Sequence, residues 1–340
     1  MTRRTYTLIV GVVVLVALFV GASQLPTQYA AMGPGVTKNV LGNADDGKVI
    51  VSLTGRTANK TSGNLNMTTV SEVDHLDLLS AIRGWFSSDE AVVPREVLFP
   101  PDKTTKQIDQ QNAQDFVQSQ DSATTAALLY LGYKNKVVLG AVPDNSPAKG
   151  VLAVGDVIDQ VDGQPVKDVD GLHAILAKLQ PGTVVTVDYQ HNHKAAHGKV
   201  TTTKPQKGDG AALGISVVFQ PVAPFDVSFH LPDIGGPSAG LMFALGLLDK
   251  VGKDNLTGGK FIAGTGTIEV NGKVGAIGGI PLKMIGAKRA GAKIFLVPAD
   301  NCAEAQAHHP SGLRLVKVST LSGAVDALKS LNSGGNPSGC

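Results

Sequence analysis

The sequence predicts a mixed α+β and α/β fold, arranged as two globular domains behind one N-terminal transmembrane helix. Its 340 residues are enough for about two domains of ordinary size. Residues 5–22 carry no charge, which indicates a membrane span. Residues 134–205 alternate short β-branched runs with Gly, Pro and Asp turns, whereas residues 206–332 mix strand and helix patterns. These three observations together favour the mixed fold.

Composition and charge exclude several classes of function. Apolar residues make up 43% of the chain and charged residues 17%, so a large core can be buried. The net charge is +2 and no long basic run occurs, which leaves nucleic-acid binding without an electrostatic basis. No GxxxxGK[ST] motif is present, so these residues do not encode ATP-driven unfolding of a substrate. We expect no cofactor.

The N-terminal segment predicts a single-pass membrane anchor. Two arginines precede the fully apolar run 8–22, and polar residues on either side complete a span of about 20 residues. A cleaved signal peptide is the alternative, because VGA at 20–22 is a tolerable cleavage site. In both cases the arginines keep the N-terminus in the cytoplasm and place the rest outside. Residues 1–24 are therefore assigned to a cytoplasmic stub and anchor, and residues 25–45 to a linker.

The two cysteines, Cys302 and Cys340, fit an exported protein that does not depend on a disulfide framework. Cys340 ends a polar tail, residues 333–340, which we expect to be flexible. A bridge between the two cysteines stays open.

Residues 134–205 resemble a PDZ domain of the bacterial protease type. The resemblance rests on SPAKG at 146–150, on VGDVIDQVDGQPV at 154–166 and on a helix expected near 171–179. Domains of this type bind extended peptide ends by adding a strand to a sheet edge. Val137 to Val142 are expected near that peptide groove.

Three histidines in the turn of the last hairpin of this region, His191, His193 and His197, raise the question of a metal ion. Their spacing matches no rigid ligand set, so a solvated loop is favoured over a zinc site. We predict no metal.

Ser238, in the segment GGPSAG, has three possible interpretations, of which a helix cap and an esterase nucleophile are the first two. The helix expected from Pro237 places Ser238 in the first helical turn, where a serine is commonly a cap. The pattern G-x-S-x-G also suggests an esterase, with Asp300 and then His308 or His309 as partners. However, a nucleophile elbow needs a strand before the serine, and LPDIGGP is a loop pattern.

A lysine base is the third reading of Ser238. A lysine with its ordinary pKa of about 10.4 is protonated, so it can act as a base only in an apolar pocket. Lys283 is the candidate, because it shares a helical face with Ala287 and Ala290.

The segments 230–240, 263–283 and 287–298 look like the proteolytic domain of Lon-type serine proteases. The resemblance implies that Ser238 is the nucleophile and Lys283 its general base, and that Thr265 orients the lysine amine. It also implies that the nucleophile and oxyanion loop is formed by Gly236, Pro237 and Ala239. One departure is a shorter loop before GGPSAG, in which Asp233 is the nearest acidic residue.

Two earlier segments, GNLNMTTV and SQDSATTAALLYLG, are similar to the front of the same family. The protease domain is therefore expected to be discontinuous, with residues 46–133 and 206–332 on either side of the PDZ domain. The resemblance implies a membrane-anchored, ATP-independent Ser–Lys endopeptidase that cleaves unfolded or flexible exported proteins, and it favours a homo-hexamer. The alternative is a membrane-tethered PDZ scaffold that binds peptides without cleaving them.

Overall fold

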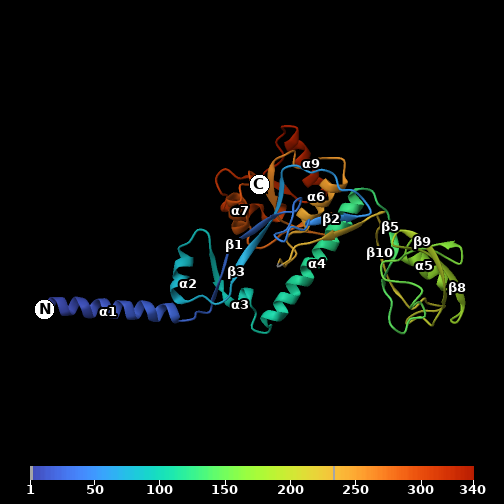
Figure 1. Ribbon diagram of the computed structural model, residues 1–340, viewed down its shortest axis with the longest axis horizontal. Coiled ribbons are helices and arrows are strands. Elements are labelled where there is room, and N and C mark those ends of the chain that lie inside the picture. The colour runs from blue at the N-terminus through green and yellow to red at the C-terminus, as the bar shows by residue number, and fades with distance from the viewer. Residues whose placement is uncertain (1–2, 233) are drawn as a thin grey trace. The chain divides into compact units, whose positions relative to one another are not determined.

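The computed structural model describes residues 3–232 and 234–340, and the chain divides into two compact units (Figure 1). The first unit contains residues up to 52 together with 58–127 and 228–340, and the second contains 53–57 and 128–227. The second unit is thus inserted into the first along the chain. Both units combine helices and strands, which confirms the predicted mixed fold.

Helix α1 (Arg3–Gln24) begins the described chain and has 22 residues. Its mean hydropathy of 2.4 makes it, among the described residues, the one helix long and apolar enough to cross a bilayer. None of its residues is buried. An N-terminal signal sequence has the same length and composition, so both readings of the segment fit this helix.

The first unit is built on a six-stranded sheet with the order β16-β15-β12-β3-β1-β4. The four strands from β16 to β3 are parallel, whereas β1 pairs antiparallel with both β3 and β4. The bounds are β1 (Tyr29–Asn39), β3 (Asn64–Val73), β4 (Ala91–Pro94), β12 (Phe261–Gly264), β15 (Ile294–Pro298) and β16 (Arg314–Val318). This parallel half is the α/β part of the fold.

Residues 25–45 are not the linker that the sequence predicts. Most of this stretch is β1, which lies between β3 and β4 in the sheet. The strand could not be predicted from the sequence, because the small and polar residues of YAAMGPGVTKN lack the alternation of a half-buried strand. Gly35 fits here because a side chain would collide with the backbone of Thr69.

Helices pack on this sheet around one fully buried helix. Every residue of α6 (Gly240–Val251) is buried, as its sequence GLMFALGLLDKV leads one to expect. The remaining helices of the unit are α2 (Leu78–Trp85), α3 (Arg95–Leu98), α4 (Thr105–Tyr130), α7 (Ile280–Arg289), η1 (Ala299–Asn301), α8 (Cys302–Ala307) and α9 (Leu321–Asn332). One short strand pair, β13 (Thr267–Ile268) with β14 (Val274–Gly275), completes it, and β2 (Val51–Thr54) pairs with β11 (Asp226–Phe229) where the chain passes from one unit to the other.

Helix α4 is much longer than the sequence indicates. The alanine-rich pattern predicts a helix over 122–133, but α4 already begins at Thr105 and runs through the polar stretch before it. Gln and Asp on solvated helix faces leave little apolar periodicity, so composition alone gave no helix signal there.

The polar tail is also held more firmly than expected. Cys302 and Cys340 form a disulfide, with their Cα atoms 5.1 Å apart. The Lys317 N–H in β16 donates to the Ser338 carbonyl at 3.0 Å. Residues 333–340 therefore lie against the sheet rather than forming the flexible tail that their composition predicts.

The second unit is a five-stranded antiparallel sheet with the order β10-β5-β6-β8-β9 and one helix. Its elements are β5 (Asn135–Ala141), β6 (Val157–Val161), β7 (Gln164–Pro165), α5 (Val169–Leu176), β8 (Val184–His191), β9 (Lys194–Thr201) and β10 (Ser216–Pro221). Leucine, isoleucine and valine side chains from both layers fill its core. Strand β10 was assigned to the protease domain by the boundary at residue 206, but it pairs with β5 in this sheet.

Candidate active site

Three segments of the first unit meet at the carboxyl end of β12. They are the loop before α6, residues 265–266 immediately after β12, and the first turns of α7. Ligands of α/β sheets commonly bind at this end of parallel strands. The structure brings together here three residues singled out in the sequence: Ser238, Thr265 and Lys283.

Ser238 lies in a turn just before α6, and not in the first helical turn as predicted. The helix begins at Gly240, and the Leu241 N–H, a first-turn donor without a partner in the helix, donates to the Gly266 carbonyl at 3.1 Å. Gly240 also has no room for a side chain, since a Cβ there would lie 2.8 Å from Ile268. This close contact with the segment after β12 accompanies the start of the helix at Gly240, two residues after Ser238.

The main chain of Ser238 is fixed from the same segment. Its carbonyl accepts a hydrogen bond from the Gly266 N–H at 2.9 Å and another from the Thr265 hydroxyl at 3.0 Å. Both lone pairs of this carbonyl are thereby occupied. The position of the Ser238 hydroxyl is therefore set by backbone contacts rather than by a flexible loop.

Lys283 reaches the serine from α7. The helix is entered through Gly279, whose φ of +69° suits glycine, and Pro281 follows at the start of the helix. The Lys283 Nζ lies 2.7 Å from the Ser238 Oγ and 3.2 Å from the Thr265 Oγ1. Its side chain is only 3% exposed.

Burial lowers the pKa of the Lys283 amine from its ordinary value of 10.5 to about 8. Thr265 is fully buried and its proton points to the Ser238 carbonyl, so its oxygen accepts an N–H of Lys283. The protonated Nζ donates to the Ser238 Oγ at 2.7 Å, and the single lone pair of a neutral amine can accept the Ser238 proton across the same contact. Chemically, the site can transfer a proton from an alcohol to an amine.

The loop residues named from sequence lie around this pair. Gly236 has a φ of +84°, Pro237 follows it, and Ala239 is the N-cap residue of α6. Together with Ser238 and Lys283, Gly236 and Ala239 line a pocket of about 530 Å³. Asp233, the acidic residue of this loop, lies outside the described residues.

Helix α4 contributes two contacts that the sequence gave no means of finding. The Ser119 hydroxyl donates to the Pro237 carbonyl at 2.9 Å, and the Gly236 N–H donates to the Asn112 carbonyl at 2.8 Å. Both residues are more than 100 positions from the loop, and neither belongs to a recognisable motif. They hold the loop on both sides of Pro237.

The esterase reading of Ser238 finds no support in these contacts. His308 is hydrogen-bonded to the Glu304 carbonyl and His309 to the Leu313 carbonyl, both in their own loop. The basic group beside the Ser238 hydroxyl is Lys283.

Two of the three histidines of this hairpin are paired with carboxylates, and the third, His197, lies in β9. His191 contacts Asp156 at 2.7 Å, and His193 contacts Asp226 at 3.2 Å. In residues 3–232 and 234–340, no group of three or more Cys, His, Asp and Glu side chains is arranged to hold a metal ion.

A second pocket, of about 680 Å³, lies within the second unit. Leu172 and Leu176 of α5 line one side, and Leu213, Ile215 and Val217 line the other. The residues expected near the groove, Val137 to Val142, do not line it, because β10 lies outside β5 at the edge of the sheet. The run GAALGISVV (210–218), a glycine turn followed by alternating apolar residues, is the signal that could have located it.

Two family models match the chain. The model of the Lon protease (S16) C-terminal proteolytic domain matches residues 217–328, and the PDZ domain model matches residues 113–202. The chain carries a Lon-type proteolytic domain and a PDZ domain. The matched Lon range includes Ser238, Thr265 and Lys283.

Curated relatives agree with the first of these matches. The chain is 33% identical over 110 residues to Lon protease 2 of Bacillus subtilis, covering 31% of this chain and 19% of that protein. It is 33% identical over 121 residues to a Lon protease of Xanthomonas oryzae, covering 34% and 14%. It is 45% identical over 69 residues to a mitochondrial Lon protease homolog of Emericella nidulans, covering 20% and 6%. The chain thus spans less than a fifth of the length of these relatives.

Among solved structures, the PDZ domain of an SdrC-like protein from Listeria monocytogenes is 28% identical. The match covers 24% of this chain and 87% of that domain, with a TM-score of 0.23.

Proposed function

We propose that the chain is an ATP-independent serine endopeptidase in which Ser238 is the nucleophile and Lys283 its general base. The observation that carries the proposal is the 2.7 Å separation of Lys283 Nζ and Ser238 Oγ in a buried site. An amine with a pKa of about 8 is neutral often enough near neutral pH to accept a proton. A serine–lysine pair also fits the protease activity that the names of the relatives indicate.

In the proposed reaction, the neutral Lys283 amine takes the Ser238 proton as the Oγ attacks the peptide carbonyl carbon. Main-chain N–H groups at Ser238 and Ala239 stabilise the tetrahedral oxyanion. The Lys283 ammonium then protonates the departing amine, which leaves an acyl-enzyme. Lys283 next takes a proton from water, which attacks the ester, and returns it to the Ser238 oxygen. Thr265 keeps the amine aimed at the serine throughout.

The proposed substrates are unfolded or flexible exported polypeptides, because the described chain contains no motor to unfold a protein. The PDZ domain binds or gates peptide ends, with a peptide added as a strand along the edge of β10 beside α5. The apolar lining of that pocket favours an apolar terminal side chain.

In this proposal α1 is an uncleaved anchor with its N-terminus in the cytoplasm, so that both domains lie outside the cell membrane. No cofactor takes part. A homo-hexamer remains a prediction from the resemblance to Lon proteases.

The test is cleavage of a permanently unfolded protein, such as reduced and alkylated casein, by the full chain without ATP. We expect cleavage by the parent and none by Ser238→Ala. Binding of a peptide with an apolar C-terminus is measured on the same samples as a control for folding of the PDZ domain. If Ser238→Ala cleaves as fast as the parent, the nucleophile is wrong. If neither cleaves while both bind the peptide, the chain is the non-catalytic scaffold.

A further inference from the structure

Helix α2 carries an exposed apolar face that the proposed chemistry does not use. Ile82, Trp85 and Phe86 follow one another at i, i+3 and i+4, so they share one side of the helix. Their exposed fractions are 40%, 52% and 88%. The adjacent face, which Trp85 borders, carries the buried Ala81 and Gly84. The helix is thus packed on one face and presents large apolar groups to solvent on the next.

The start of α2 is joined directly to the end of the candidate membrane span. The Leu78 N–H donates to the Leu25 carbonyl at 3.1 Å, one residue after α1 ends, and the Thr27 N–H donates to the Leu76 carbonyl at 2.8 Å. Pro26 and Asp77 form a bridge between them. Helices α1 and α2 also contact each other (Figure 1). A bilayer crossed by α1 therefore has its surface within a few residues of α2.

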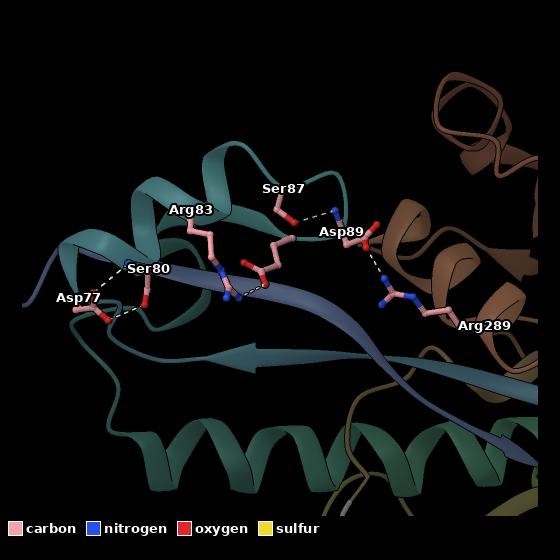
Figure 2. A network of polar contacts seen from close by, with 7 residues as sticks. Asp77, Ser80, Arg83, Ser87, Asp89 and Arg289 are labelled. Carbon is pink, nitrogen blue, oxygen red and sulfur yellow. Dashed lines mark hydrogen bonds and ion pairs between the residues drawn. The ribbon is translucent and has the colours of Figure 1, made fainter. Parts of the chain in front are cut away.

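Polar contacts hold α2 and the loop that follows it in place (Figure 2). Asp77 caps the helix by accepting from the Ser80 N–H at 3.0 Å, and Arg83 is paired with Glu90 at 3.1 Å. Asp89, in the loop after the helix, is paired with Arg289 of α7. Glu90 and Asp89 are each paired with an arginine, which reduces their repulsion from lipid phosphates. The apolar face therefore belongs to a helix that is held by polar contacts at both ends, and not to a loop.

The aromatic residues suit the boundary between lipid and water. The Trp85 indole packs edge-on against Tyr29 with ring centroids 5.2 Å apart, and half of it remains exposed. Tryptophan is enriched at membrane interfaces, where its apolar body enters lipid and its N–H stays near water. Phe86, almost wholly exposed, is costly in water but favourable in lipid.

We propose that Ile82, Trp85 and Phe86 insert into the interface of the same bilayer that α1 crosses. The first unit is then held to the membrane at two places: α1 spans the bilayer, and α2 lies at its surface. This inference rests on the proposed anchor role of α1, but not on the Ser–Lys chemistry. Lipid is preferred over a protein partner because α2 is hydrogen-bonded to the residues that directly follow the candidate span.

The experiment uses the fact that Trp85 is the one tryptophan of the chain. The full chain is reconstituted into vesicles of phosphatidylcholine and phosphatidylglycerol, with or without lipids that carry a nitroxide near the top or near the end of the acyl chain. We expect Trp85 emission at shorter wavelength than in the unfolded chain, and stronger quenching by the shallow nitroxide than by the deep one. The Phe86→Asp variant should lose most of this quenching.

Val270→Asp is the matched control, because Val270 is a half-exposed apolar residue of the same unit away from α2. It should leave the quenching unchanged. Equal Trp85 emission with and without nitroxide lipids, in a chain that stays in the vesicles after alkaline washing, would overturn the inference and leave the anchor intact. Loss of the chain on washing would overturn both. Protection of Trp85 that depends on protein concentration but not on nitroxide would assign the face to a second copy, and would also overturn it.

Discussion

Among the described residues of the first unit, two lysines are buried, Lys250 and Lys283. Their surroundings show why only Lys283 is a candidate base. Lys250, at the end of α6, is 5% exposed, and Lys283, in α7, is 3% exposed. Burial lowers the pKa of both amines. The two sites are therefore alike in the property that is usually used to find a catalytic lysine.

Their neighbours differ. Lys250 follows Asp249, whose negative charge partly restores the pKa of the amine, while burial raises the pKa of the carboxyl group. Lys283 has two hydroxyl groups within 3.2 Å, from Ser238 and Thr265. A hydroxyl group carries no negative charge, so it stabilises the ammonium form less than a carboxylate does. Burial therefore marks both lysines as candidates, and the neighbouring group, a carboxylate for Lys250 and two hydroxyls for Lys283, distinguishes them.

The largest expected effect is on cleavage. Lys283→Met should reduce the rate of peptide hydrolysis by at least about 10,000-fold, as expected for loss of a member of a catalytic unit. Lys250→Met, the matched control, should stay within about threefold of the parent, because Lys250 makes no described contact with the site. Both are measured on unfolded casein. Equal losses in the two variants would mean that Lys283 acts through stability alone.

The second effect is on stability. The pKa of Lys283 is lower in the folded than in the unfolded chain, so burying its charged form costs stability. This loss of stability is complete below pH 8, and it disappears as the pH rises to 10.5. Lys283→Met should raise the free energy of unfolding at pH 7 by up to about 3 kcal/mol. The gain should shrink above pH 8. Urea unfolding followed by Trp85 fluorescence, which reports on the same unit, measures it.

Lys250→Met should instead lower the free energy of unfolding, because the buried Asp249 loses the adjacent positive charge. If both variants stabilise the unit equally, the two lysines are equivalent and the distinction drawn from their neighbours is wrong.

The third effect is on the pH dependence of cleavage. The active form has a neutral Lys283, so kcat/KM should rise with loss of one proton at about pH 8 and then level off. At pH 7 the rate should be roughly one tenth of the plateau. Lys250→Met should keep the same profile. A profile that is flat from pH 6 to 9 would exclude Lys283 as the base.

The smallest effect concerns Thr265. Thr265→Val keeps the shape but removes the oxygen that accepts from Lys283 and donates to the Ser238 carbonyl. We expect kcat to fall about fivefold with KM unchanged, the value of roughly one hydrogen bond. Thr267→Val, two residues further on, is the control. An increase in KM with kcat preserved would place Thr265 in substrate binding instead.

The residues of the site were easier to predict than the elements that hold them. Ser238, Thr265 and Lys283 lie in short motifs, and the structure brings them together. Ser119 and Asn112 act through single long-range hydrogen bonds, which leave no trace in a local pattern. The start of α6 was placed at Pro237 because proline commonly occupies the first helical position, whereas the contacts of Ser238 and Gly240 with residues 265–268 keep the residues before Gly240 in a turn.

The fold shows the same division. The mixed class follows from the alternation of strand and helix patterns, and α6 follows from a long run of apolar residues. Strand β1 and the assignment of β10 to the PDZ sheet depend on which strands pair, and pairing is decided by the whole sheet. The polar half of α4 was missed because its solvated face has no periodic apolar signal.

The closeness of Lys283 Nζ and Ser238 Oγ also has a consequence for inhibitor chemistry. Two electron-pair donors at 2.7 Å are close enough to share one electrophilic atom with little rearrangement. In a small boronic acid that reaches the pocket, the serine oxygen would replace one boron hydroxyl, which leaves as water with the serine proton, and the lone pair of the neutral lysine would complete a four-coordinate boron. The resulting ring-like adduct should outlast one made to the hydroxyl alone, and should become labile again in acid, when the nitrogen lone pair takes up a proton.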